Sequence, residues 1–194
     1  MTLLDKLKVY VVSDEINTAE VKPVMVRMNV HKWDSFRVLK TVDWHCNLTS
    51  NSVELLSEFD IYKYLSDNSY NADEYMVEFQ LIDDDRIVSK NFAFPGNFKA
   101  LKNVRNPNPK LKVSVDKCEK NVHKISLEVK IESPAIFMSI AMKHDQIKTY
   151  RFSKDGFNQF EPIQMIDVTF DNPECKFVIS IDDFVVQTLN KFLM

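Results

Sequence analysis

Glycine is almost absent from this chain. Its 194 residues include only Gly96 and Gly156, whereas average usage is about 7%. The phosphate-binding loops G-x-G-x-x-G and G-x-x-x-x-G-K-[ST] need at least two closely spaced glycines, and so does the G-x-S-x-G nucleophile elbow. The sequence therefore excludes nucleotide-binding folds and hydrolases that are built on these loops.

Cysteine is also scarce, and its spacing excludes two classes of small protein. Cys46, Cys118 and Cys175 form no C-x-x-C pair, which rules out a zinc ribbon, and they are too few for a disulfide-rich scaffold. A bridge between Cys118 and Cys175 stays open as an alternative. Spacing alone does not show that their Cα atoms come within about 7 Å, so we expect free thiols.

Long apolar runs and an excess of basic charge are missing as well. No stretch approaches the roughly 18 apolar residues of a membrane helix. The start of the chain carries Asp5, Lys6 and Lys8, which is not typical of a signal peptide. The net charge is −3, so no phosphate-neutralising surface is indicated. We expect neither a membrane nor a nucleic acid as a partner.

The chain instead contains many short runs of β-branched and aromatic residues. Val21–Val30 alternates apolar and polar positions, and Tyr75–Ile82 and Arg86–Phe94 read as a hairpin whose acidic tip takes its turn conformation from Asp residues. One short helix is expected over Ser57–Leu65, with Ser57 as its cap. The remaining predicted strands are Leu7–Val12, Trp33–Val42, Leu111–Val115, Lys124–Ile131, Ala135–Met142, Ile163–Phe170, Lys176–Ile181 and the tail Asp182–Leu193.

A proline-containing segment divides these strands into two groups. Lys99–Lys110 contains Pro107 and Pro109, which stiffen it and remove two backbone donors. Each group is near the size of an immunoglobulin-type domain, and short strands without intervening helices favour antiparallel sandwiches. The prediction is an all-β fold of two tandem antiparallel immunoglobulin-like β-sandwiches, residues 1–104 and 110–194. At 194 residues the chain is too short for a (β/α)₈ barrel, which needs about 250.

No spacing of polar residues predicts a metal, a cofactor or a catalytic residue. His45 and Cys46 point to opposite faces of a strand, so with His31 they are assigned structural roles. The acidic run Asp83–Asp85 lacks the Gly and Glu positions of a calcium loop, which favours a solvated hairpin tip. Cys118 and His123 are only five residues apart and carry no other sign of a thiol nucleophile. The basic residues of the Lys99–Lys112 stretch lack aromatic stacking partners and are interpreted as a solvated linker.

Three residues remain as candidate sites for carbohydrate. Trp33 and Trp44 could stack on sugar rings, although packing in the core is the favoured interpretation of both. Asn47 begins the triplet Asn-Leu-Thr, which is a glycosylation acceptor if the chain enters the secretory pathway.

One segment carries a family resemblance. Arg151–Gln159 reads RFSKDGFNQ and follows the apolar Pro134–Met142. This pair resembles the last domain of lysosomal-type β-mannosidases of glycoside hydrolase family two. Gly156 would occupy the tip of a polar turn, with Phe152 and Phe157 buried on either side.

The resemblance extends in patches over nearly the whole chain. Val9–Asp14 and Val24–Trp33 are similar to strands that open the preceding immunoglobulin-like domain of these enzymes. Asn91–Leu101 is similar to the segment that closes it, and Asp183–Leu193 to the family's terminal strand.

The resemblance implies a non-catalytic role, because these enzymes hold their two catalytic glutamates on a preceding (β/α)₈ barrel. A retaining pair needs carboxyl groups about 5 to 5.5 Å apart on a rigid scaffold. The chain would thus be the C-terminal region of a β-mannosidase, with the catalytic barrel as its partner and a lysosomal or secreted location. The alternative is a free-standing module that binds mannose-containing glycans or another protein.

Overall fold

The computed structural model describes residues 6–14, 21–119, 121–144, 146–147 and 149–193. The chain forms two compact units. The first comprises Met1–Trp33 and Arg37–Lys102, and the second comprises Asp34–Phe36 and Asn103–Met194. The break in the expected linker therefore falls between Lys102 and Asn103, a few residues before the expected start of the second module.

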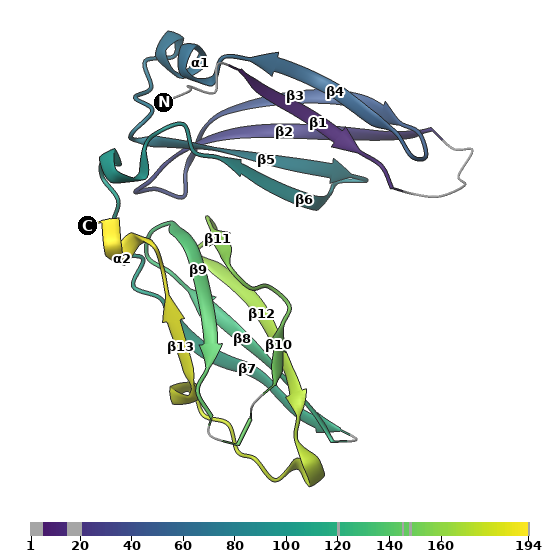
Figure 1. The fold of residues 1–194 in the computed structure, drawn as a ribbon, viewed down its shortest axis with the longest axis vertical. Coiled ribbons are helices and arrows are strands. Elements are labelled where there is room, and N and C mark those ends of the chain that lie inside the picture. The colour runs from purple at the N-terminus through teal and green to yellow at the C-terminus, as the bar shows by residue number, and fades with distance from the viewer. Residues whose placement is uncertain (1–5, 15–20, 120, 145, 148, 194) are drawn as a thin grey trace. The chain divides into compact units, whose positions relative to one another are not determined.

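The first unit is a sandwich of a four-stranded and a two-stranded antiparallel sheet (Figure 1). The four-stranded sheet has the order β3-β2-β5-β6, and the two-stranded sheet pairs β1 with β4. The bounds are β1 Leu7–Val12, β2 Lys22–Lys32, β3 Val38–Leu48, β4 Val53–Phe59, β5 Tyr75–Asp83 and β6 Arg86–Ala93.

Alternation of apolar side chains explains this packing. On β2, Val24, Val26 and Met28 are buried and face the second sheet. The β5–β6 hairpin turns at Asp84 and Asp85, whose φ angles are 45° and 61°. This agrees with the expectation that Asp residues supply the left-handed turn conformation here in place of glycine.

The short helix lies later than the sequence suggested. Helix α1 spans Ile61–Asp67, and the carboxylate of Asp60 caps it by accepting from the backbone N–H of Lys63 at 2.9 Å. Ser57 instead belongs to β4 and pairs with Val9 of β1. The expectation of Ser57 as a cap was wrong because β4 ends only at Phe59, and strand pairing with β1 takes priority over the local helical spacing.

The second unit is a sandwich of four strands against three. One sheet has the order β10-β12-β8-β7 and the other β11-β9-β13, and their facing side chains form one continuous apolar core. The bounds are β7 Lys110–Glu119, β8 Val122–Lys130, β9 Ala135–Met142, β10 Tyr150–Phe152, β11 Phe157–Gln159, β12 Ile163–Asp171 and β13 Phe184–Gln187. The predicted all-β class of antiparallel sandwiches is confirmed.

The segment RFSKDGF connects the two sheets of this unit. Its first part is β10, which pairs with β12, and its last part begins β11, which pairs with β9. Gly156 lies between them with φ of +65°, and Phe152 and Phe157 pack against the core. The single glycine of the segment therefore allows the chain to cross from one sheet to the other.

Three expected strands differ from the structure. Trp33–Val42 is not continuous, because a turn separates β2 from β3 before Val38. The expected strand Lys176–Ile181 is irregular up to Ser180 and then enters the 3₁₀ turn Ile181–Asp183, and another 3₁₀ turn, Pro173–Cys175, precedes it. The tail is a strand only over Phe184–Gln187 and ends in helix α2, Asn190–Leu193. Some of their backbone N–H groups bond outside any strand ladder: Trp33 donates to the carbonyl of Glu74, Phe177 to the Asn172 side chain and Leu189 to the carbonyl of Ile136.

Most side chains of the proline segment are exposed, as expected for a solvated linker, and its backbone is held at a few points. A third 3₁₀ turn, Phe98–Ala100, precedes the break. After the break, the carbonyl of Pro107 accepts from the N–H of Glu132 at 2.9 Å, and the carbonyl of Arg105 accepts from the Asn190 amide at 2.9 Å. The residues that follow Lys102 are therefore held by hydrogen bonds of the second unit.

Candidate functional site

The described residues contain no group of three or more His, Cys, Asp or Glu side chains placed to hold a metal ion. Cys46 is a buried free thiol, and burial raises the pKa of its sulfur above the ordinary 9.0. Its neighbour His45 is exposed, as expected for adjacent positions of one strand. No helix in the described ranges is long and apolar enough to cross a membrane.

A polar cluster in the first unit surrounds Glu78 on β5. Its carboxylate is buried and accepts from Gln80 at 2.8 Å and Asn29 at 3.3 Å, and it lies 3.3 Å from His31 Nε2. The Lys90 ammonium of β6 lies 3.2 Å from the other oxygen. These partners come from three neighbouring strands, so the cluster ties β2, β5 and β6 together.

The cluster keeps Glu78 ionised. Burial alone raises the pKa of this carboxyl, but the His31 hydrogen bond, the Lys90 charge and the Asn29 hydrogen bond outweigh it and bring the pKa down to about 2. A carboxylate held this firmly by partners cannot serve as a proton donor near neutral pH. Glu78 is therefore a structural anchor.

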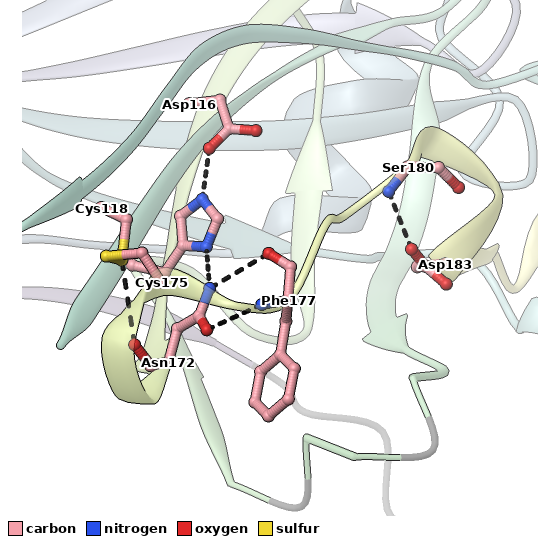
Figure 2. A network of polar contacts seen from close by, with 8 residues as sticks. Asp116, Cys118, Asn172, Cys175, Phe177, Ser180 and Asp183 are labelled. Atoms are coloured by element: carbon pink, nitrogen blue, oxygen red, sulfur yellow. Dashed lines mark hydrogen bonds and ion pairs between the residues drawn. A yellow bond between two sulfur atoms is a disulfide. The ribbon is translucent and has the colours of Figure 1, made fainter.

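A second polar cluster surrounds a disulfide in the second unit (Figure 2). Cys118 at the end of β7 and Cys175 in the turn after β12 are bonded, with Cα atoms 5.8 Å apart. The expectation of free thiols was wrong. The antiparallel pairing of β7, β8 and β12 brings residues 57 positions apart within bridging distance, which spacing along the chain does not reveal.

Asn172 organises the loop that carries this disulfide. Its amide donates to the carbonyl of Phe177 at 3.1 Å and to His123 Nδ1 at 2.8 Å, and its carbonyl accepts from the N–H of Phe177 at 3.0 Å. His123 Nε2 in turn bonds Asp116. Both polar atoms of this buried amide are thereby paired, and the backbone N–H and C=O of Phe177 are satisfied without a strand partner. The pairing of Cys118 with Cys175 leaves it no thiol for nucleophilic chemistry beside His123.

The candidate sugar-stacking residues lie in different environments. Trp33 is 1% exposed and stacks on Phe94 at a centroid distance of 5.8 Å, so its ring presents no open face. Trp44 on β3 is partly buried and stacks on Phe59 at 6.3 Å. Both rings take part in the core of the first unit, which is the interpretation that the sequence favoured. Asn47 near the end of β3 is exposed, as a glycan acceptor must be.

An apolar surface that the sequence did not predict lies on the outer face of β1 and β4. Tyr10 pairs with Leu55, and Val12 pairs with Val53. Their exposed fractions are 50%, 47%, 61% and 67% in that order. Glu58 closes one end of the patch through ion pairs with Lys6 at 3.0 Å and Lys8 at 3.5 Å. We call these four side chains the β1–β4 patch.

A cleft of about 400 Å³ lies between β1 and β6 of the first unit. It exists because the two-stranded sheet does not extend over β6 at the edge of the four-stranded sheet. Its floor is apolar, and exposed polar side chains of β6 line one wall. The lining residues are Leu7–Val12, Val26, Phe79, Leu81, Ser89 and Asn91–Ala93.

The comparisons with known proteins agree with this architecture. Residues 5–100 match the family model of the Mannosidase Ig/CBM-like domain. A solved structure of a β-D-mannosidase from Dictyoglomus thermophilum is similar over 95% of this chain, with 17% identity and a TM-score of 0.59. The chain spans 20% of the length of that enzyme. No curated protein matches the sequence.

These observations place the protein among the all-β proteins built from immunoglobulin-like sandwiches. More specifically, residues 5–100 form a Mannosidase Ig/CBM-like domain. This confirms the resemblance to the immunoglobulin-like domains of β-mannosidases that the sequence indicated. The likeness to the solved mannosidase extends the shared fold to the second unit. The described strands and helices form no (β/α)₈ barrel.

Proposed function

We propose that this chain is the non-catalytic C-terminal region of a β-mannosidase-like glycoside hydrolase, and that it packs on the catalytic barrel and stabilises it. The family match over residues 5–100 carries the proposal. The fold supports it, because a chain of this type corresponds to about a fifth of a β-D-mannosidase. The catalytic barrel is thus the proposed partner.

The β1–β4 patch is the proposed contact surface for the barrel. The patch has four adjacent apolar side chains on one face of the sheet, and ion-paired Lys and Glu side chains lie at one end of it. An apolar centre with a polar rim is typical of a protein interface. Contiguous exposed apolar groups of this kind mark interaction sites on soluble proteins.

A binding experiment tests this contact. The chain is mixed with the separately expressed barrel polypeptide of a family-two β-mannosidase encoded in the same genome, and the complex is measured by size-exclusion chromatography with light scattering. Wild type should form a one-to-one complex, and the double variant Val12→Glu/Val53→Glu should lose it. The matched control is Ile163→Glu/Met165→Glu, which changes two apolar residues of β12 with 50% and 48% exposure. Equal binding by both double variants would contradict the assignment of the patch.

The non-catalytic role has its own assay. The purified chain is incubated with a chromogenic β-mannoside, and we expect no turnover above a heat-denatured control. Reproducible turnover that is lost on denaturation would overturn the proposal.

We also propose that the chain is made in the secretory pathway, as lysosomal or secreted proteins are. The Cys118–Cys175 disulfide supports this, because such bonds persist mainly in oxidising compartments. The exposed Asn47 of the glycosylation triplet is compatible with it. Treatment of the native protein with a peptide N-glycosidase should reduce its mass and convert Asn47 to Asp. An unmodified Asn47 in the protein from its natural source would count against a glycosylated form.

A further inference from the structure

The backbone of Phe177 fixes the orientation of the Asn172 side chain. The N–H of Phe177 donates to the Asn172 oxygen at 3.0 Å, and its carbonyl accepts from the Asn172 nitrogen at 3.1 Å (Figure 2). Turning the amide by 180° would set N–H against N–H and oxygen against oxygen. The second N–H of Asn172 therefore donates to Nδ1 of His123, 2.8 Å away.

This orientation in turn fixes the protonation state of His123. A ring nitrogen that accepts a hydrogen bond carries no proton, so the single proton of the neutral ring is on Nε2. Nε2 donates it to the carboxylate of Asp116 on β7. A second proton could enter only at Nδ1, where it would face the N–H of Asn172. His123 is 4% exposed and Asn172 is fully buried, so bulk water does not separate these two donors.

Asp116 is the charged side chain that acts directly on the His123 ring. The cross-strand partners of His123 are Cys118, which is in the disulfide, and the apolar Phe170. His144, after β9, contacts the ring of Phe177 at a centroid distance of 5.7 Å. The register places the other charged residues near His123 on these strands on the opposite face of the sheet. They are Lys117, Glu119, Lys124 and Asp171.

The segment held by Asn172 contributes to the core without belonging to a sheet. Phe177 packs against the core of the second unit, and Ile179 is buried within it. Lys176 is exposed. Cys175 has a φ of 54°, a left-handed conformation that is strained in a residue other than glycine. Because the disulfide ties Cys175 to β7, residues 176–180 can leave the core while the chain stays attached.

We propose that His123 and Asn172 form a pH-sensitive switch that releases residues 176–180 when His123 is protonated. A proton on Nδ1 places two donors opposite each other, and turning the amide to offer its oxygen to His123 breaks both bonds to Phe177. Once Asn172 has moved, the Asp116 carboxylate stabilises the imidazolium as an ion pair. Protonation therefore favours release, and release favours protonation. Histidine changes charge between about pH 8 and pH 5, so acidification should uncover Phe177 and Ile179.

NMR of the full chain measures both parts of the switch. Long-range ¹H–¹⁵N spectra between about pH 8 and pH 5 follow the ring nitrogens of His123, and hydrogen exchange gives the protection factor of the Phe177 amide. We expect a neutral ring with its proton on Nε2 at the alkaline end. Ring protonation and loss of Phe177 protection should follow one titration curve, with protection reduced at least about tenfold in acid. A ring that gains its second proton while Phe177 keeps its protection would overturn the proposal.

Two variants separate His123 from other groups that titrate in this range. His144→Gln removes the other histidine next to Phe177 and should leave the Phe177 curve unchanged. A curve that disappears in this variant would assign the effect to His144 and refute the switch.

Asn172→Asp replaces the donor with a carboxylate oxygen, which accepts from a protonated Nδ1 as well as from the Phe177 N–H. Phe177 protection in this variant should not fall on acidification, and the wild-type decrease in a folded Asn172→Asp protein would contradict the role of the amide. If the variant does not fold, the wild-type and His144→Gln titrations decide the proposal.

Discussion

The Glu78 cluster makes the stability of the first unit depend on acid pH. The carboxyl has a pKa of about 2 in the folded protein, against 4.5 for the ordinary side chain. A group whose folded pKa is lowered stabilises the fold above its unfolded pKa, and this contribution is lost as pH falls toward the folded pKa. The difference corresponds to about 3 kcal/mol at pH 7 and about 1 kcal/mol at pH 3.

Replacement of Glu78 by Gln removes the charge and nearly preserves the shape. The variant should lose about 3 kcal/mol of unfolding free energy at pH 7 and about 1 kcal/mol at pH 3, because wild type has itself lost most of the contribution by then. Urea unfolding at a series of pH values, followed by tryptophan fluorescence, measures the difference. Both tryptophans of the chain, Trp33 and Trp44, lie in the first unit, so the signal reports that unit alone.

The matched control is Glu54→Gln, which changes an exposed glutamate of β4 in the same unit. Its effect should stay within about 0.5 kcal/mol at every pH. The reasoning would be refuted if the Glu78→Gln deficit did not shrink between pH 5 and pH 2, or if it were no larger than that of the control.

Three further substitutions test the other contacts. Cys175→Ser removes the disulfide to Cys118, which lies 57 residues away in the sequence. It should lower the unfolding free energy of the second unit by about 4 kcal/mol. An unfolding curve by circular dichroism that matches that of non-reduced wild type would contradict this. Asn172→Ala removes the hydrogen-bond partners of the Phe177 N–H, the Phe177 carbonyl and His123 Nδ1. It should lower the unfolding free energy of the second unit by at least about 2 kcal/mol, measured in the same way. Gly96→Ala would place Cβ 2.6 Å from the Ala72 carbonyl oxygen. It should lower the unfolding free energy of the first unit, measured by the fluorescence transition in urea, by about 1 to 3 kcal/mol.

Local patterns were sufficient for most strands. Leu7–Val12 and Ala135–Met142 have the predicted bounds, because alternation along a strand is a property of neighbouring residues. The acidic hairpin tip and the turn at Gly156 were predicted for the same reason. Strand β4 was missed because its apolar residues do not mark one buried face. Val53 and Leu55 are apolar but exposed, so the sequence of β4 shows no alternation of apolar core positions with polar surface positions.

The candidate sites were harder to predict, since their residues are distant in sequence. No residue near Glu78 in the sequence indicates that His31 and Lys90 will be its partners. Asn172 likewise belongs to no sequence motif that predicts its contact with His123. The β1–β6 cleft arises from what the two-stranded sheet leaves uncovered, which depends on the number of strands in each sheet. A residue-by-residue pattern carries no such information.

The sequence by itself determined that this protein is built from short antiparallel strands in two sandwiches, with a family signature and without glycine-rich loops, because composition and period-two alternation are local properties. Only the tertiary structure decided that Cys118 meets Cys175, that Trp33 is enclosed, and that the β1–β4 patch and the cleft remain open. These features depend on which strands become neighbours, and strand pairing is set by the cooperative burial of the whole core.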